Sequence, residues 1–209
     1  MLAAMSLRWT ILAPVYDRMS RKSEEAGMGV MREGLLAEAS GRVLEIGGGT
    51  GANLRYYDGL ESLVVTEPEP AMLRRLQDRM REQSVRAEVV QAPAEGLPFE
   101  DASFDTVVST LVLCGVDQER SLGEVRRVLR PGGRLLFLEH VRSDDPALAR
   151  LQDRMNRLNR FLVGCECNRA TLTAIEAAGF TISRVERTTM PEAPKFVRPA
   201  IVGTAVVAG

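Results

Sequence analysis

Residues 43–54, VLEIGGGTGANL, decide the fold of this chain. The run Arg42–Ile46 is typical of a short apolar strand, and glycines follow it at positions 47, 48, 49 and 51. Because glycine adopts positive φ angles and has no Cβ atom, the turn can bend sharply and a ligand can lie across it. The helix expected next would direct its free N–H groups at that ligand. The stretch therefore predicts a binding turn for a carboxylate or phosphate group.

The glycine turn alone leaves the ligand open. Gly47, Gly49 and Ala52 fit the G-x-G-x-x-G/A pattern of dinucleotide-binding turns. Glu67 ends the next expected strand, where a carboxylate accepts hydrogen bonds from ribose hydroxyls. A nicotinamide dinucleotide and S-adenosylmethionine both contain that ribose, so these residues predict an adenosine-containing ligand. A packing turn without a ligand is the remaining alternative.

The composition is that of an ordinary globular chain. Its 209 residues suit one domain, or one domain with a short appendage, and 45% are hydrophobic. A net charge of -1 indicates no general attraction to nucleic acid or to an anionic membrane. Three cysteines cannot form a disulfide framework, so we expect a reducing compartment, the cytoplasm. No uncharged run approaches the roughly 20 residues of a membrane span. Residues 1–22 read as an amphipathic segment, for which peripheral membrane contact is an alternative.

Strand and helix patterns alternate along the chain, which predicts an α/β sheet with helices on both faces. We expect strands over 42–46, 63–67, 88–92, 105–113, 134–141, 180–187 and 201–207. We expect helices over 23–39, 70–80, 117–129, 146–162 and 171–178. The sequence Pro131-Gly132-Gly133 is expected to end the third helix before the fifth strand starts.

Two of these helices carry apolar stripes that predict which face is buried. In the first, the stripe consists of Val30, Met31, Leu35 and Leu36. In the fourth, it consists of Leu148, Leu151, Met155, Leu158 and Leu162, with arginines on the opposite side. Core packing is the simpler interpretation of the fourth stripe, and the wall of an apolar substrate site is the alternative.

Three later segments resemble class I S-adenosylmethionine-dependent methyltransferases. They are AEGLPFEDASFD (94–105), STLVLCGV (109–116) and EVRRVLRPGGRLLFLEHV (124–141). Members of this family have such segments in the same order, and dehydrogenases do not. The resemblance covers about residues 40–209. It implies a Rossmann-like seven-stranded sheet whose last strand is antiparallel, with S-adenosylmethionine across the carboxyl ends of the first two strands. It further implies a helical cap over residues 1–39 and a helical insertion at about 144–162.

The tail gives a finer resemblance. Together with STLVLCGV (109–116) and EHV (139–141), the tail segments look like the alkyl-thiol methyltransferases of the methyltransferase-like seven group. The tail segments are GCECNRAT (164–171), AAGF (177–180) and PEAPKFVRPAIVGTAV (191–206). This resemblance implies methyl transfer to a small apolar acceptor, with a thiol preferred. Oxygen, nitrogen or carbon acceptors on a quinone, polyketide or lipid are alternatives. A nicotinamide-dependent dehydrogenase and a non-catalytic sensor of an adenosine ligand remain as other classes. We expect a monomer or a homodimer.

The resemblance also implies which residues hold the cofactor. They are Glu45, Gly47, Gly48, Gly49, Gly51, Asn53, Glu67, Pro68, Met72, Ala94, Glu95, Thr110 and Leu111. The glycines line the methionine part, and Glu45 orients their turn or the ammonium group. Glu67 takes the ribose hydroxyls, while Pro68, Met72, Ala94 and Glu95 surround the adenine. Thr110 and Leu111 face the sulfonium and the acceptor.

Two residues are candidates for catalysis. His140, the one histidine of the chain, is expected where the fifth strand ends and is the candidate general base. A structural histidine bonded to a backbone carbonyl is an equally weighted alternative. Tyr16 lies in the expected cap, where its ring could cover the sulfonium through a cation–π contact or merely anchor the segment. Cys165 and Cys167 form a C-x-C pair, but zinc needs four ligands, so we expect no metal.

Overall fold

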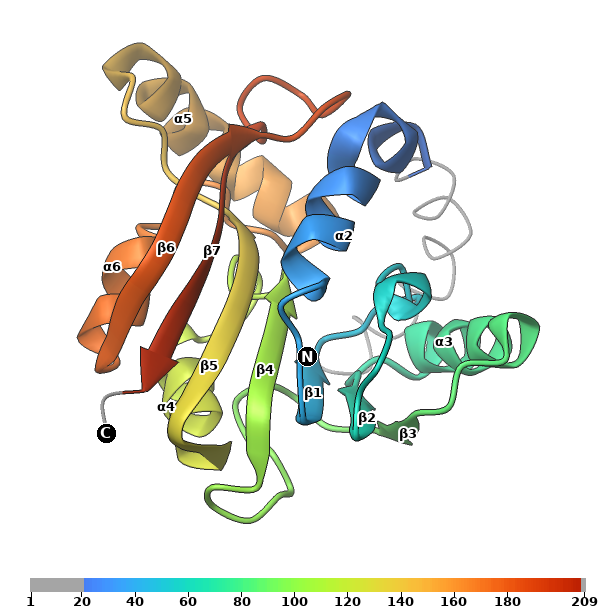
Figure 1. Ribbon diagram of the computed structural model, residues 1–209. Helices are drawn as coiled ribbons and strands as arrows, with labels where there is room; N and C mark the ends of the chain where they lie inside the picture. The colour runs from blue at the N-terminus through green and yellow to red at the C-terminus, as the bar shows by residue number, and fades with distance from the viewer. Residues whose placement is uncertain (1–20, 208–209) are drawn as a thin grey trace.

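The computed structural model describes residues 21–207 around a seven-stranded sheet (Figure 1). The strands are β1 (Arg42–Ile46), β2 (Ser62–Thr66), β3 (Glu88–Val90), β4 (Phe104–Thr110), β5 (Leu129–His140), β6 (Phe180–Thr189) and β7 (Pro199–Val207). Their order across the sheet is β3-β2-β1-β4-β5-β7-β6, and β7 runs antiparallel to both of its neighbours. The predicted Rossmann-like sheet with an antiparallel last strand is confirmed.

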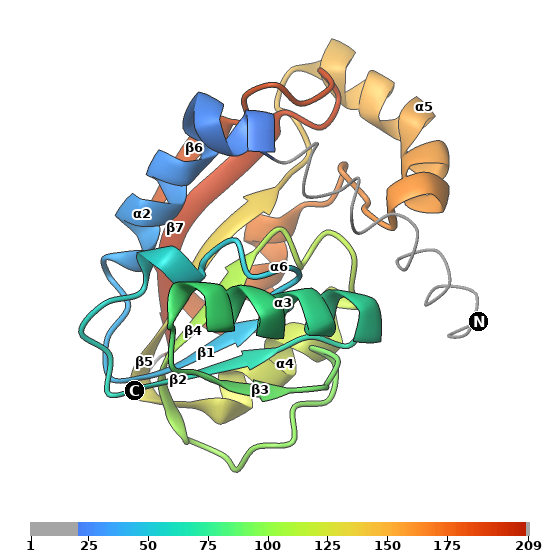
Figure 2. The same ribbon diagram turned by 90° about the vertical axis from the view of Figure 1, so that its right-hand side faces the viewer.

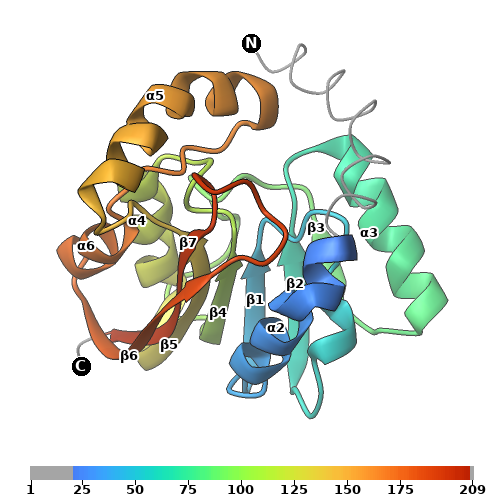
Figure 3. The ribbon, with the colours of Figure 1, turned by 90° about the horizontal axis from the view of Figure 1, so that it is seen from above.

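Helices cover both faces of the sheet (Figure 3). One face carries η1 (Glu24–Met28), α2 (Gly29–Leu36), the short η2 (Leu54–Tyr56) and α3 (Pro70–Gln83). The other face carries α4 (Gln118–Val128) and α6 (Thr171–Ala177), and α5 (Pro146–Val163) lies beyond the carboxyl end of β5 (Figures 1 and 2). Because the central strands are buried on both faces, they read in the sequence as nearly continuous apolar runs.

The strand β5 starts earlier than its sequence predicts. Leu129 already pairs with Phe104, so Pro131-Gly132-Gly133 lies inside the strand, and the register against β4 shifts between Phe104 and Thr106. Gly132 has a φ of 75°, and a Cβ on Gly133 would lie 2.8 Å from the Arg130 carbonyl oxygen. The two glycines therefore allow a bulge where the sequence pattern indicates a stop.

The predicted helix over 23–39 is interrupted at Gly27, whose φ of 139° separates η1 from α2. The predicted stripe is partly wrong, because Val30 is 73% exposed while Leu35 and Leu36 are buried. Met28 and Arg32 take the remaining buried positions of this face. The helix is therefore turned about its axis relative to the predicted stripe, because Arg32 bonds to buried polar partners.

The stripe predicted to bury α5 is wrong as well. Leu151, Leu158 and Leu162 are exposed by 37%, 49% and 52%, whereas Ala149 and Gln152 are buried. The Gln152 amide donates to the carbonyl oxygens of Val141 (3.0 Å) and Cys167 (2.7 Å) and accepts from the Ser143 N–H (2.8 Å). Hydrogen bonding at a polar residue therefore orients α5, against its apolar periodicity. None of the helices described between residues 21 and 207 is long and apolar enough to cross a membrane.

We expect Gln152→Ala to lower the free energy of unfolding by roughly 2–4 kcal/mol, because two buried carbonyls and one N–H lose their partner. Arg150→Ala on the exposed side of the same helix is the control, with an expected effect of about 0.5 kcal/mol or less. Urea denaturation measures both. Equal effects of the two substitutions would show that Gln152 does not anchor α5.

Candidate cofactor and acceptor site

The glycine turn follows β1 and is closely packed on one side. Gly47, Gly49 and Gly51 all have positive φ angles. A Cβ on Gly47 would lie 2.7 Å from Val112 Cγ2, and one on Gly51 would lie 2.8 Å from Leu54 Cδ1. Gly48 packs against Val65 in the same way, and its N–H donates to the Thr66 carbonyl (2.9 Å). Around Gly49, by contrast, nothing lies within 4 Å of a Cβ position, so the turn offers a ligand open space there.

Glu67 lies beside that open space. One carboxylate oxygen accepts from the Gly49 N–H (2.9 Å), and the other accepts from the Glu69 N–H (2.9 Å). Burial raises the pKa of Glu67, and these two backbone hydrogen bonds oppose the shift. The structure thus brings together the turn and the carboxylate that the sequence analysis singled out.

A buried hydrogen-bond network supports the turn from below. Glu45 on β1 accepts from the Asn53 side-chain amide (2.9 Å) and from the Tyr57 hydroxyl (2.8 Å). Burial raises the pKa values of both Glu45 and Tyr57, and for Glu45 these hydrogen bonds oppose the shift. Asn53 also donates to Thr110 Oγ1 (3.0 Å) at the end of β4. Glu45 and Asn53 therefore orient the turn relative to β4.

The sequence analysis missed Arg32, the cation of this network. Its Nε donates to Glu24 Oε1 (2.9 Å), and its Nη1 donates to Asn53 Oδ1 (2.7 Å) and Thr110 Oγ1 (3.0 Å). Only 5% of Arg32 is exposed. Its position four residues after Met28 and three before Leu35 was the available signal, because an arginine within the apolar face of a helix needs buried partners.

The loop after β4 is held by Glu139, which the sequence analysis also missed. Glu139 Oε1 accepts from Ser109 Oγ (2.6 Å) and from the Val112 N–H (3.1 Å). Burial raises its pKa to about 7. Its second oxygen, Oε2, has no hydrogen-bond partner among residues 21–207. Leu111, with a φ of 61°, begins this loop.

His140 follows on β5 and is 6% exposed. Burial lowers the pKa of its imidazole to about 4, and a hydrogen bond to the Val197 backbone opposes that shift. Its Nδ1 has no partner within the part of the chain that the structure describes. A neutral imidazole with this pKa is a weak base, which favours the structural alternative. The catalytic role of His140 stays a prediction, and Tyr16 lies outside the described residues.

The residues assigned to the adenine follow two neighbouring strands. Pro68 and Met72 come after β2, and Ala94 and Glu95 come after β3, so all four lie near the carboxyl edge of the sheet. Met72 and Ala94 are buried, whereas Pro68 is exposed and its carbonyl accepts from the Gln91 side chain (3.1 Å). Glu95 is turned towards the start of α4, where it accepts from the Asp117 N–H (3.1 Å).

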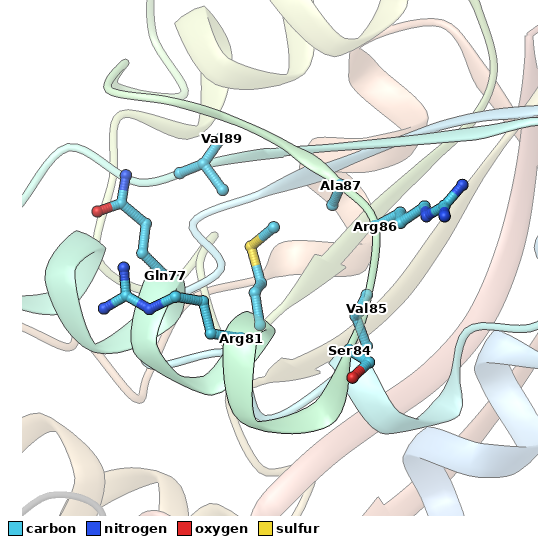
Figure 4. Close-up of a pocket in the computed structure, with 8 residues that line it drawn as sticks. Gln77, Arg81, Ser84, Val85, Arg86, Ala87 and Val89 are labelled. Carbon is cyan, nitrogen blue, oxygen red and sulfur yellow. The ribbon is translucent and has the colours of Figure 1, made fainter.

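A second depression lies at the opposite end of α3 (Figure 4). It is lined by Gln77 and Arg81 of α3 and by Arg86 and Val89 at β3. Since α3 begins next to Glu67 and runs away from the carboxyl edge, this depression is separate from the glycine turn. No group of three or more histidine, cysteine, aspartate or glutamate side chains within residues 21–207 is arranged to hold a metal ion.

Comparisons with known proteins agree with this geometry. A family model described as a methyltransferase domain matches residues 44–137, from β1 into β5. The human thiol S-methyltransferase TMT1A is 33% identical, over 96% of this chain and 83% of that protein. The chain belongs to the S-adenosylmethionine-dependent methyltransferases. Within them it groups with the thiol S-methyltransferases.

Two further similarities show how widely this methyltransferase fold is shared. The ubiquinone/menaquinone biosynthesis C-methyltransferase UbiE of Ectopseudomonas mendocina is 40% identical, over 54% of this chain and 46% of that protein. The crystal structure of geranyl diphosphate C-methyltransferase from Streptomyces coelicolor A3(2), in complex with S-adenosyl-L-homocysteine, has a TM-score of 0.67. It is 13% identical and covers 86% of this chain and 79% of its own, so it supports the fold alone.

The residues present fit the cofactor of this family. Open space at Gly49 and the adjacent Glu67 carboxylate offer partners for hydroxyl and ammonium groups.

We expect Glu67→Gln to weaken the binding of S-adenosylhomocysteine about ten-fold or more, because a charged acceptor for two hydroxyls is lost. Isothermal titration calorimetry measures the dissociation constant, and Glu61→Gln, an exposed residue just before β2, is the control. Unchanged affinity in the Glu67 variant would contradict the assignment.

Glu139 gives a second prediction, on pH dependence. Its pKa of about 7 lies above its ordinary value of 4.5, so the folded state binds this proton more tightly than the unfolded state does. The stabilisation that comes with this proton is complete below pH 4.5 and is lost as the pH rises through 7.

Glu139→Gln keeps an acceptor for Ser109 and Val112 but does not titrate. Its stability relative to the natural protein is therefore expected to improve as the pH rises from about 5 to about 8. Urea denaturation across this range, with the exposed Glu100→Gln as control, measures the difference. A difference that stays flat with pH would mean that Glu139 has no raised pKa.

Proposed function

We propose that the protein transfers the methyl group of S-adenosylmethionine to the sulfur of a small apolar thiol. The observation that carries this proposal is the extent of the similarity. The similarity to the human thiol S-methyltransferase spans 96% of the chain, whereas that to the quinone C-methyltransferase spans 54%. In this proposal the acceptor side is built from late segments, α5 and the loop between β6 and β7, so similarity over nearly the full length bears on the acceptor.

The surroundings of the acceptor side support an apolar molecule. Above the carboxyl ends of β4 and β5 lie η1, the loop of residues 190–198 and α5 (Figures 1 and 2). Ser23 Oγ donates to the Pro191 carbonyl (2.8 Å), which joins the segment before η1 to this loop. The exposed leucines of α5 offer apolar surface in the same region.

A thiol acceptor suits the weak acid–base equipment of the site. When bound, the cofactor supplies a methyl group on a positively charged sulfur, which is already an activated electrophile. A free thiol with a pKa near 8.5 is partly ionised at about pH 7, so a strong general base is unnecessary. The neutral, buried His140 is compatible with this requirement. An oxygen acceptor would require a stronger base.

The chain's own residues would hold and orient the reactants. Glu67 and the Gly49 N–H would bind the ribose end, and Arg32 would attract the carboxylate of the methionine part through the network of Asn53 and Thr110. Glu139 would keep the loop after β4 in position, so that Leu111 and Val112 border the acceptor. Residues 1–39 would act as the cap that excludes water, with residues 40–209 as the methyltransferase domain that contains the helical insertion. The free thiols of the cysteines favour a reducing compartment such as the cytoplasm.

A panel of acceptors tests the proposal. We expect methyl transfer from S-adenosylmethionine with a deuterated methyl group to alkyl thiols, and rates at least about ten-fold lower with phenols and quinols, whose oxygens need a stronger base. Mass spectrometry of the products identifies the methylated atom. Glu67→Gln, a variant of the cofactor site, is the control. Its lower rate relative to the natural protein would show that turnover belongs to this site. Turnover of a phenol with no turnover of any thiol would refute the proposal.

A further inference from the structure

Two loops that are distant in the sequence meet beside the acceptor side. The loop after α5 lies against the loop after β4, where the Glu166 N–H donates to the Cys114 carbonyl (2.8 Å). A Cβ on Gly115 would lie 3.4 Å from the Gly164 carbonyl oxygen, so the two backbones are in close contact. The thiols of Cys114 and Cys165 interact across this junction, and this interaction raises the pKa of Cys114. This arrangement provides the close approach of two backbones that a disulfide requires.

The two thiols differ in access. Cys114 is 3% exposed, and its Sγ makes one further long contact, with the Leu111 carbonyl oxygen (3.6 Å). Cys165 is only partly buried, so an oxidant can reach it first. The interaction with Cys165 and burial raise the pKa of the Cys114 thiol, so Cys114 is the poorer nucleophile for the first step. The third cysteine, Cys167, is fully buried and its thiol is free.

We propose that Cys114 and Cys165 are a redox-active pair that closes to a disulfide in the presence of a low-molecular-weight disulfide. The Cys165 thiolate attacks the small disulfide and releases one small thiol, leaving a mixed disulfide. The Cys114 sulfur then attacks Cys165 and releases the second small thiol. The two cysteines lose two electrons and two protons in total, and the small disulfide gains them as two thiols.

The bond would act on the acceptor side. Cys114 lies in the loop that Glu139 holds, and Val112 in that loop packs against Gly47 of the cofactor turn. Cys165 follows the end of α5, whose last turn it joins through a hydrogen bond from the Asn159 amide to its carbonyl (2.7 Å). Two thiol sulfurs that are not bonded must draw closer to reach the S–S bond length of about 2.05 Å. The resulting shift of the loop is expected to slow methyl transfer about ten-fold or more.

The first test is chemical and does not depend on activity. The whole protein is incubated with oxidised glutathione, alkylated without reduction and digested with a protease. We expect a peptide pair linked through Cys114 and Cys165, its disappearance after reduction by dithiothreitol, and a single alkylated cysteine, Cys167. Cys167→Ser is expected to form the same link. A protein that carries only mixed disulfides, that links Cys167, or that does not react would overturn the proposal.

The second test measures the consequence and rests on the proposed thiol acceptor. At a fixed concentration of the acceptor thiol, its own disulfide is added in increasing amounts and initial rates are measured. The natural protein and Cys167→Ser are expected to lose activity about ten-fold or more. Cys165→Ser is expected to keep its rate. Equal loss in Cys165→Ser would show that the pair does not control turnover, and absence of any thiol methylation would refute the proposed function while leaving the chemical test intact.

Discussion

The buried guanidinium of Arg32 is the interaction on which the arrangement of the site depends. A cation taken out of water is stable only where charges and hydrogen-bond acceptors inside the protein replace its hydration. Glu24 supplies the charge, and Asn53 and Thr110 supply the acceptors. These partners come from η1, from the chain after the glycine turn and from the end of β4. Because they must all meet one planar group, the helix before the sheet, the turn and β4 are held in a single arrangement.

Much of the fold could be predicted because its signals are local. The bounds of β1, the glycine turn after it and the position of Glu67 follow from apolar runs and from glycines, and the structure has them as expected. The number of strands and the antiparallel direction of the last strand followed from the resemblance to a family. By contrast, Glu139 and Gln152 matter through partners elsewhere in the chain, so their own neighbours gave no direct signal. Arg32 was indicated only by its place within the apolar face of a helix.

The two wrong stripes have the same cause. In α2 the buried partners of Arg32 select the face, and in α5 the carbonyls bound by Gln152 do so. In both helices a single buried polar group outweighs several apolar positions, because leaving its hydrogen-bond partners unsatisfied costs more than exposing a leucine. Periodicity counts apolar residues and does not register this cost. Glu139 and His140 are consecutive residues of β5, so their side chains point to opposite faces of the sheet. They therefore have different roles.

The position of β7 has a consequence for biosynthesis. This strand is the last of the sheet in chain order, yet it lies between β5 and β6 and bonds to both. While residues 199–207 are still inside the ribosome, β6 has no partner in the sheet, and one side of β5 presents unpaired backbone groups together with apolar side chains. Folding of the whole sheet must therefore wait until β7 has left the ribosome, and a chain truncated shortly before β7 would have two aggregation-prone strand edges.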